Sequence, residues 1–211
     1  VLATGVARHV AFAQSFSSYF SLVALLGVTY YGVRACASVR DDRTELSRTV
    51  KELLVILGCS TTAVSIVYVV SVFTVPKMNA QFELFLMFGL SIWLASFGVE
   101  WFYQALEQYE YITIRSVCFK ILALVLMFAF VKNRGDYVTY GFIVVVAGYG
   151  SNVLNLLRLR KFIDLHDGAK LDVKRHFKPM LWFMIASISS GMYIQVDIVM
   201  LGFLGTTNML V

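Results

Sequence analysis

Long stretches of apolar residues dominate the order of hydrophobic and polar positions along the chain. Residues 9–33, 53–76, 137–157 and 179–196 contain no Asp, Glu, Lys or Arg, and these stretches are 25, 24, 21 and 18 residues long. A helix needs about 20 mostly apolar residues to cross a hydrocarbon core of about 30 Å. Strands of a membrane barrel would instead alternate apolar and polar residues. The pattern predicts several membrane-spanning α-helices.

Six spanning helices can be placed, with ends defined to within about two to four residues. Pro76 is expected to end the second helix, and Pro179 to lie in the first turn of the sixth, where its missing N–H costs nothing. Gly27 and Gly98 are expected inside helices, because small residues let membrane helices approach closely. The predicted helices are Val10–Val33, Leu53–Val75, Phe82–Ala105, Tyr111–Val131, Tyr137–Leu157 and Pro179–Leu204.

Composition supports this fold class. Hydrophobic residues make up 59% of the 211 residues and charged residues 15%, with a mean hydropathy of +0.74. Soluble domains carry about a quarter charged residues, and one core could not bury this much apolar surface. We expect an all-α integral membrane protein, a multi-pass bundle whose excess apolar surface faces lipid.

Basic residues predict the orientation. The connections after the first, third and fifth helices, with the helix ends that flank them, hold 14 Lys and Arg, whereas those after the second and fourth hold 3. The positive-inside rule makes the richer side cytoplasmic. The net charge of +5 is therefore a topology signal, and it gives no reason to invoke nucleic acid.

The charged connection 158–178 divides the chain into two groups of helices. We expect a first lobe over residues 1–158, a cytoplasmic inter-lobe loop over 159–178 and the start of a second lobe over 179–211. Val-Leu-Ala-Thr-Gly at 1–5 and Phe-Leu-Gly-Thr-Thr at 203–207 are weakly alike, as in a repeat. Paired helical halves are common in secondary transporters. Because the chain starts without Met and stops within an apolar run, both ends are interpreted as cut.

Catalytic and metal-binding motifs are not apparent. Cys36, Cys59 and Cys118 are far apart and are expected to be free, buried thiols. The three histidines, His176 among them, are interpreted as isolated, because none pairs with a Cys or carboxylate at ligand spacing. No Gly-rich phosphate loop follows a strand. We expect neither an enzyme nor a bound cofactor or metal.

Three segments resemble the polysaccharide flippases of the Wzx type, a branch of the multidrug/oligosaccharidyl-lipid/polysaccharide exporter superfamily. They are FAQSFSSYFSLVALLGVTYYGVRACASVRDD (12–42), GVEWFYQALEQYEYITIRSVCFKILALVLMFAFVK (98–132) and IQVDIVMLGFLGTT (194–207). The middle segment is the most specific, because its Glu-Trp pair, acidic tyrosine cluster and Ile-Thr-Ile-Arg-Ser are not a generic apolar pattern. The similarity extends through essentially the whole chain.

This resemblance implies a fold of two six-helix lobes, similar to that of the MATE exporters, of which the chain would cover the second to seventh helices. It also implies transport of an undecaprenyl-pyrophosphate-linked oligosaccharide from the inner to the outer leaflet of a bacterial cytoplasmic membrane, for O-antigen, capsule or another surface polymer. The expected partners are that lipid-linked substrate and membrane lipids, with the polysaccharide polymerase as a further candidate.

Cations at membrane depth are the first candidates for binding the pyrophosphate. Ionisable groups at a helix centre cost at least about 2.5–3.5 kcal/mol, so they usually face a cavity or each other. Arg115 and Lys120 lie in the predicted helix Tyr111–Val131, and phosphate accepts from Arg bidentately and attracts Lys as a point charge. The alternative is that both extend to the cytoplasmic interface, with Arg115 paired to Glu107 or Glu110.

Three further candidates remain open between a structural and a functional role. Glu100, Gln104 and Glu107 are spaced to share one helix face, where they would form a gate, pair with the cations, or only meet water. Arg34, beside two tyrosines, is a candidate cavity residue or an interfacial anchor. Asp197, predicted in the outer half of the sixth helix, is a candidate for ion coupling or for a contact between lobes.

Two other functions remain possible for the sequence. A MATE-like drug or cation antiporter on the same fold would have a smaller and less basic cavity. A membrane-embedded polymerase or scaffold without a transport cycle would carry a large extracytoplasmic loop with paired arginines, and no such loop occurs in this sequence. Fold similarity alone does not decide among them.

Overall fold

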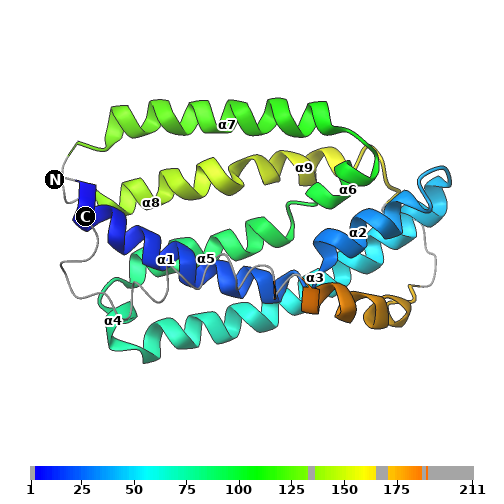
Figure 1. Cartoon of the computed structure of the whole chain (residues 1–211), viewed down its shortest axis with the longest axis horizontal. Helices are drawn as coiled ribbons and strands as arrows, with labels where there is room; N and C mark the ends of the chain where they lie inside the picture. The colour runs from blue at the N-terminus through cyan, green and yellow to red at the C-terminus, as the bar shows by residue number, and fades with distance from the viewer. Residues whose placement is uncertain (1–2, 133–135, 165–170, 187–188, 190–211) are drawn as a thin grey trace.

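The computed structural model describes residues 3–132, 136–164, 171–186 and 189, and every regular element in that part is helical (Figure 1). Residues 174–186 form a helix that has no label in the figure and is drawn in orange. The labelled elements are α1 (Ala3–Ala24), α2 (Val28–Ala37), α3 (Arg43–Thr74), α4 (Pro76–Asn79), α5 (Phe82–Ser96), α6 (Glu100–Ala105), α7 (Tyr109–Phe130), α8 (Tyr137–Val145), the π-helix η1 (Val146–Gly150) and α9 (Ser151–Leu159).

Several of the described helices are long and apolar enough to span a membrane. Four pass on length and composition, namely Arg43–Thr74, Phe82–Ala105, Tyr109–Phe130 and Val138–Leu159, and the bent pair α1–α2 makes a fifth. Large apolar side chains are exposed along them, such as Phe128, whose exposed fraction is 78%. The predicted multi-pass helix bundle is confirmed.

The helices run alternately up and down the bundle. Connections 38–42, 106–108 and 160–164 lie together on the right of Figure 1, and connection 75–81 lies at the opposite end. We call the end that holds connections 38–42, 106–108 and 160–164 the basic end, because these connections, together with the helix ends that flank them, hold most of the Lys and Arg residues. The grouping agrees with the sidedness that the charge distribution predicts.

The long helix α3 begins at Arg43, well before the predicted start at Leu53. Asp42 caps it, because its side chain accepts from the backbone N–H of Thr44 at 2.9 Å and of Glu45 at 3.2 Å. Hydropathy marks only the apolar part of a helix, so it missed these charged first turns. At the other end α3 stops at Thr74, because the residue before Pro76 avoids helical geometry.

The predicted continuous helix Val10–Val33 is wrong. α1 and α2 meet at an angle of 41° across residues 25–27, and α2 continues to Ala37. Gly27 has a φ of +74°, and an added Cβ would lie 2.6 Å from the carbonyl carbon of Phe183. Only glycine tolerates both the left-handed backbone and this approach of helix 174–186. Gly27 therefore forms the bend and does not lie inside a helix.

The third and fifth predicted helices are also interrupted. Phe82–Ala105 divides into α5 and α6 at residues 97–99, where Val99 has a left-handed φ of +42°, so Gly98 lies in a break. The fifth helix contains the π-helical turn η1 between α8 and α9. The fourth, predicted over Tyr111–Val131, is the continuous helix α7.

The sixth predicted helix begins earlier than expected. Helical residues start at 174, so Pro179 lies beyond the first turn and its ring removes one backbone hydrogen bond. The predicted end at Leu204 lies outside the described residues. The three cysteines are free, as predicted, but only Cys36 is buried, whereas Cys59 and Cys118 are exposed on the bundle. A side chain that faces lipid meets the same apolar surroundings as one in a core.

Two apolar cores fill the bundle. The core near the basic end includes Val28, Leu53, Trp101 and Met180, and the other includes Phe85 and Phe88. In the second core the buried hydroxyl of Tyr68 joins three helices, because it contacts Ser17 Oγ at 2.8 Å and donates to the carbonyl of Phe85 at 2.6 Å.

We predict that Gly27→Ala destabilises the protein by at least about 1–2 kcal/mol, the cost of a left-handed alanine, with the steric clash in addition. A chain of this size should then melt at least a few degrees lower in detergent. Gly148→Ala is the matched control, because nothing lies within 4 Å of its added Cβ. The control should be neutral or slightly stabilising. Equal melting temperatures for the two variants would contradict the proposed role of Gly27.

Candidate functional site

Arg115 of α7 is a buried cation inside a bundle that faces lipid. Its side chain is 3% exposed, and its guanidinium pairs with Glu100 at 3.2 Å. The same group donates to the backbone carbonyl of Ser151 at 3.4 Å and lies 5.8 Å from the ring centre of Tyr111. Arg115 thus links α6, α7 and α9. The sequence offered two kinds of partner, Glu107 or Glu110 for Arg115 at the interface, or pairing of the group that contains Glu100 with the cations of this helix. The structure shows the pair with Glu100.

The break between α5 and α6 places Glu100 opposite Arg115. Interrupting a helix frees backbone carbonyls, which need new donors within a membrane. Two asparagines of α9 supply them, because Asn152 donates to the carbonyl of Leu94 at 3.0 Å and Asn155 to that of Gly98 at 2.7 Å. An added Cβ at Gly98 would lie 2.6 Å from Asn152 Cγ, so glycine is needed for this approach.

Several buried polar atoms at or near this break have no hydrogen-bond partner within the part of the chain that the structure describes. They include Ser96 Oγ and Trp101 Nε1, which flank the break, with the Nε of Arg115, a donor, and the Oδ1 of Asn155, an acceptor. Buried polar atoms are normally satisfied. The broken helix thus leaves unsatisfied polar groups inside the bundle beside α6.

Glu100 and Gln104 share α6, but Glu107 does not lie on their face. α6 ends at Ala105, and Glu107 has a left-handed φ of +59°. Its carboxylate pairs with Arg40 at 2.8 Å, where both side chains are exposed. Of the predicted trio, then, Glu100 pairs with a cation of α7, Gln104 is half-buried and Glu107 belongs to the surface of the basic end.

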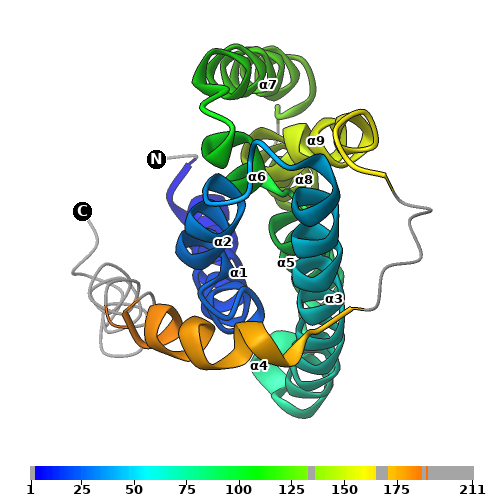
Figure 2. The same ribbon diagram turned by 90° about the vertical axis from the view of Figure 1, so that its right-hand side faces the viewer.

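Lys120 and Arg34 differ from Arg115 because both are exposed. Neither forms an ion pair with a described residue. Figure 2 views the molecule from the basic end, where α7, α6 and α2 follow one another along one side of the bundle. The sequence-predicted residues Arg34, Gln104 and Lys120 thus come from three neighbouring helices. Asp197 lies outside the described residues.

Arg158, at the end of α9, lies over an aromatic cluster. Its guanidinium carbon is 3.8 Å from the ring centre of Tyr111, 5.6 Å from that of Phe162 and 5.8 Å from that of Tyr103. A cation over aromatic faces is stabilised by the negative potential of the rings. The sequence counted Arg158 only as part of a basic loop, and no spacing signal linked it to Tyr103 and Tyr111.

A second polar cluster, which the sequence analysis missed, surrounds Glu52 of α3. The Glu52 side chain is 0% exposed. Oε1 accepts from the backbone N–H of Asp172 at 2.6 Å and from Arg48 at 3.2 Å. Oε2 accepts from Arg175 at 2.7 Å and contacts the Nε2 of His176 at 2.7 Å. We call these residues, with Tyr31, the Glu52 cluster.

His176 is not isolated, as the sequence had indicated. Its Nδ1 lies 2.7 Å from the hydroxyl of Tyr31 on α2, and its Nε2 contacts Glu52 on α3. An ionised carboxylate only accepts, so Nε2–H donates to Glu52, and Nδ1 shares a hydrogen bond with the Tyr31 hydroxyl in which either atom can be the donor. The only sequence signal was a Glu that immediately precedes a 24-residue uncharged run. Among the described residues, no group of three His, Cys, Asp or Glu could hold a metal ion.

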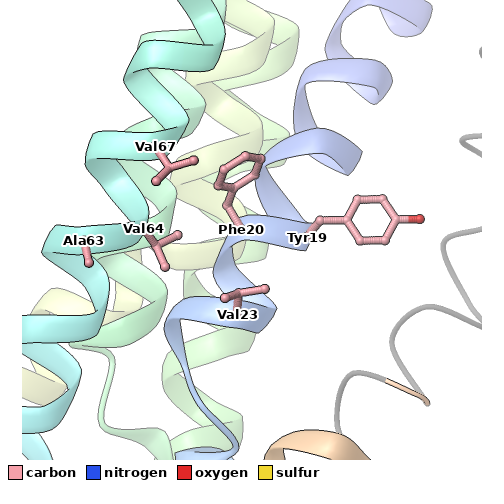
Figure 3. Close-up of a pocket in the computed structure, with 6 residues that line it drawn as sticks. All are labelled: Tyr19, Phe20, Val23, Ala63, Val64 and Val67. Atoms are coloured by element: carbon pink, nitrogen blue, oxygen red, sulfur yellow. The ribbon is translucent and has the colours of Figure 1, made fainter.

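A groove between α1 and α3 has a volume of about 320 Å³ (Figure 3). Its lining is apolar, and the Tyr19 hydroxyl points away from α3. The groove therefore offers no polar group to a sugar or phosphate. It is lined by Tyr19, Phe20, Val23, Ala63, Val64 and Val67.

We predict unequal effects from breaking the Arg115–Glu100 pair at its two ends. Glu100→Gln leaves a buried guanidinium without a counter-charge and should cost about 1–3 kcal/mol. Arg115→Met leaves a carboxylate that is 43% exposed and can hydrate, so the loss should be smaller. The double variant should recover most of the loss. Thermal unfolding in detergent measures all three variants, and additive losses would contradict the pairing.

Comparison with known proteins gives one family and no individual relative. The family model described as polysaccharide biosynthesis protein matches residues 8–209, which is nearly the whole chain. No curated protein and no solved structure matches significantly. The match agrees with the resemblance to polysaccharide flippases on residues 12–42, 98–132 and 194–207. With its multi-pass helical bundle, the chain belongs to the polysaccharide biosynthesis protein family of membrane proteins.

Proposed function

We propose that this chain is part of a transporter that flips an undecaprenyl-pyrophosphate-linked oligosaccharide from the inner to the outer leaflet of a bacterial cytoplasmic membrane. The cargo would be a repeat unit of O-antigen, capsule or another surface polysaccharide. In this proposal the chain moves its substrate without making or breaking a covalent bond, and it needs no cofactor. The lipid-linked substrate and the surrounding lipids are its main partners.

The observation that carries the proposal is the family match over residues 8–209 on a bundle with helices long and apolar enough to cross a membrane. A polysaccharide assembled from lipid-linked units made inside the cell needs a membrane step that moves each unit outward. The interruptions at residues 25–27 and 97–99 support a transporter, because discontinuous helices are typical of transporter binding sites.

The exposed cations supply a binding chemistry for the pyrophosphate. Arg34 of α2 and Lys120 of α7 lie on helices on either side of α6, which carries Gln104. An unpaired cation on a membrane-spanning helix is costly unless it meets water or an anion. We assign the pyrophosphate contact to Arg34 and Lys120, and sugar hydrogen bonds to Gln104. Arg115, already neutralised by Glu100, holds the three helices in position.

Flipping can be tested directly. The protein is reconstituted into vesicles with a fluorescent undecaprenyl-pyrophosphate glycolipid, and a membrane-impermeant quencher reports the fraction in the outer leaflet. Protein-containing vesicles should exchange the lipid faster than empty vesicles. In cells, expression should restore surface polysaccharide to a strain that lacks its flippase. If flipping stays at the empty-vesicle rate and complementation also fails, the proposal is wrong.

We predict that Lys120→Ala lowers the flipping rate about tenfold, the change expected when one charge-assisted contact worth about 1.4 kcal/mol is lost. Its stability should change by less than about 0.5 kcal/mol, because the side chain is exposed and makes no ion pair with a described residue. Lys132→Ala, at the other end of the same helix, is the matched control and should flip normally. Equal rates for the two variants would remove Lys120 from the binding site.

A further inference from the structure

The Glu52 cluster joins two parts of the chain that lie far apart in sequence. The donors to Glu52 from the backbone of Asp172 and from the side chains of Arg175 and His176 are 120 to 124 residues away. Figure 2 shows the orange helix 174–186 lying across α3 on one side and α1–α2 on the other. The cluster therefore fastens the start of this helix to the basic end of the first group of helices.

The ion pairs around Glu52, which also include the neighbouring Glu45, are balanced in charge. Arg48 and Arg175 supply two positive charges, and Glu45 and Glu52 supply two negative charges, with contacts between 2.7 and 3.7 Å. The Glu52 side chain is 0% exposed, and a buried charge without partners is strongly destabilising. Glu52 therefore depends on its hydrogen bonds from Arg48, Arg175, His176 and the backbone of Asp172.

The cluster also has a hydrogen-bonded arm to α2. Tyr31 contacts His176 Nδ1 at 2.7 Å, and Arg175 reaches Thr49 of α3 at 3.3 Å. Further along helix 174–186, an added Cβ at Gly27 would lie 2.6 Å from the carbonyl carbon of Phe183, so the two backbones approach each other closely there. The contacts of Arg175 and His176 with Tyr31, Thr49 and Glu52 thus lie at the start of helix 174–186, at the basic end.

We propose that Glu52 is a positioning residue whose cluster latches helix 174–186 to α2 and α3 and so closes the basic end of the transporter. The proposal rests on the proposed transport function, in which that end must open for cargo to enter and close for it to leave. When the latch opens, Glu52 and its donors become hydrated. When it closes, the carboxylate is desolvated among its partners, which favours one definite arrangement of the two parts.

The test measures the separation of the two parts directly. Spin labels are attached to Ser38→Cys and Lys174→Cys, both exposed positions at the basic end, after the three native cysteines are replaced by serine. Double electron–electron resonance then gives the distance distribution in detergent and in lipid. We expect Glu52→Gln to increase the population of a longer distance about tenfold, as for a lost hydrogen bond to a charged group.

Two further variants keep the test decisive if Glu52→Gln folds poorly. Tyr31→Phe removes only one hydroxyl and should shift the distances in the same direction by a smaller factor. Arg175→Gln combined with Glu52→Gln should have less effect than the sum of the two single changes, because both remove the Arg175–Glu52 contact. Glu83→Gln, an exposed carboxylate at the opposite end, is the control and should leave the distances unchanged.

The outcomes separate the latch from the transport function. Unchanged distances in folded Glu52→Gln and Tyr31→Phe, or equal shifts in Glu83→Gln, would overturn the latch. Longer distances with normal melting temperatures would support it. The flipping rate of these variants should then fall although their melting temperatures stay normal. Because the distances are measured without substrate, failure of the unsubstituted protein to flip lipid would count against the proposed function and leave the distance result to stand by itself.

Discussion

The constraint on which this structure depends is the absence of water from the hydrocarbon core. Each backbone N–H and C=O must find a partner inside the protein, so the spanning segments are helices. Where a helix is interrupted, side chains have to replace the lost backbone bonds. Asn152 and Asn155 do so for the break between α5 and α6. The break is therefore tolerated because α9 begins beside it, and Glu100 can leave the line of α5 to meet Arg115.

The interruptions give the basic end a different packing from the rest of the bundle. The short helices α2 and α6 lie side by side there, with Gly32 against the ring of Trp101. Their core is continuous with Leu53 of α3 and with Met180 of helix 174–186. A bend at Gly27 and a break at Gly98 thus free two short segments from the long helices that precede them. Both polar clusters of the described structure involve this group of segments.

Apolar runs predicted the membrane class and the position of α7, because lipid exposure acts on every residue of a span. The Lys and Arg residues predicted which connections lie at the same end. The same signal missed the start of α3, since its first turns are charged and Asp42 caps them. It also placed no break at residues 97–99, because a broken span keeps the composition of a continuous one. Glu52 and His176 escaped notice because they are 124 residues apart, and only tertiary packing brings them together.

Electrostatics divides the cations near the basic end into two groups with different consequences. Arg115 and Arg175 are each paired with a carboxylate on another element, so their charges hold helices together. Arg34 and Lys120 have no such partner in the described part of the chain, although an apolar helix carries each of them. An uncompensated cation is kept at such a position only at a cost in stability. That cost is offset when an anionic group binds there. A phosphate-bearing head group would therefore gain the most binding free energy at the unpaired cations, rather than at the buried ones.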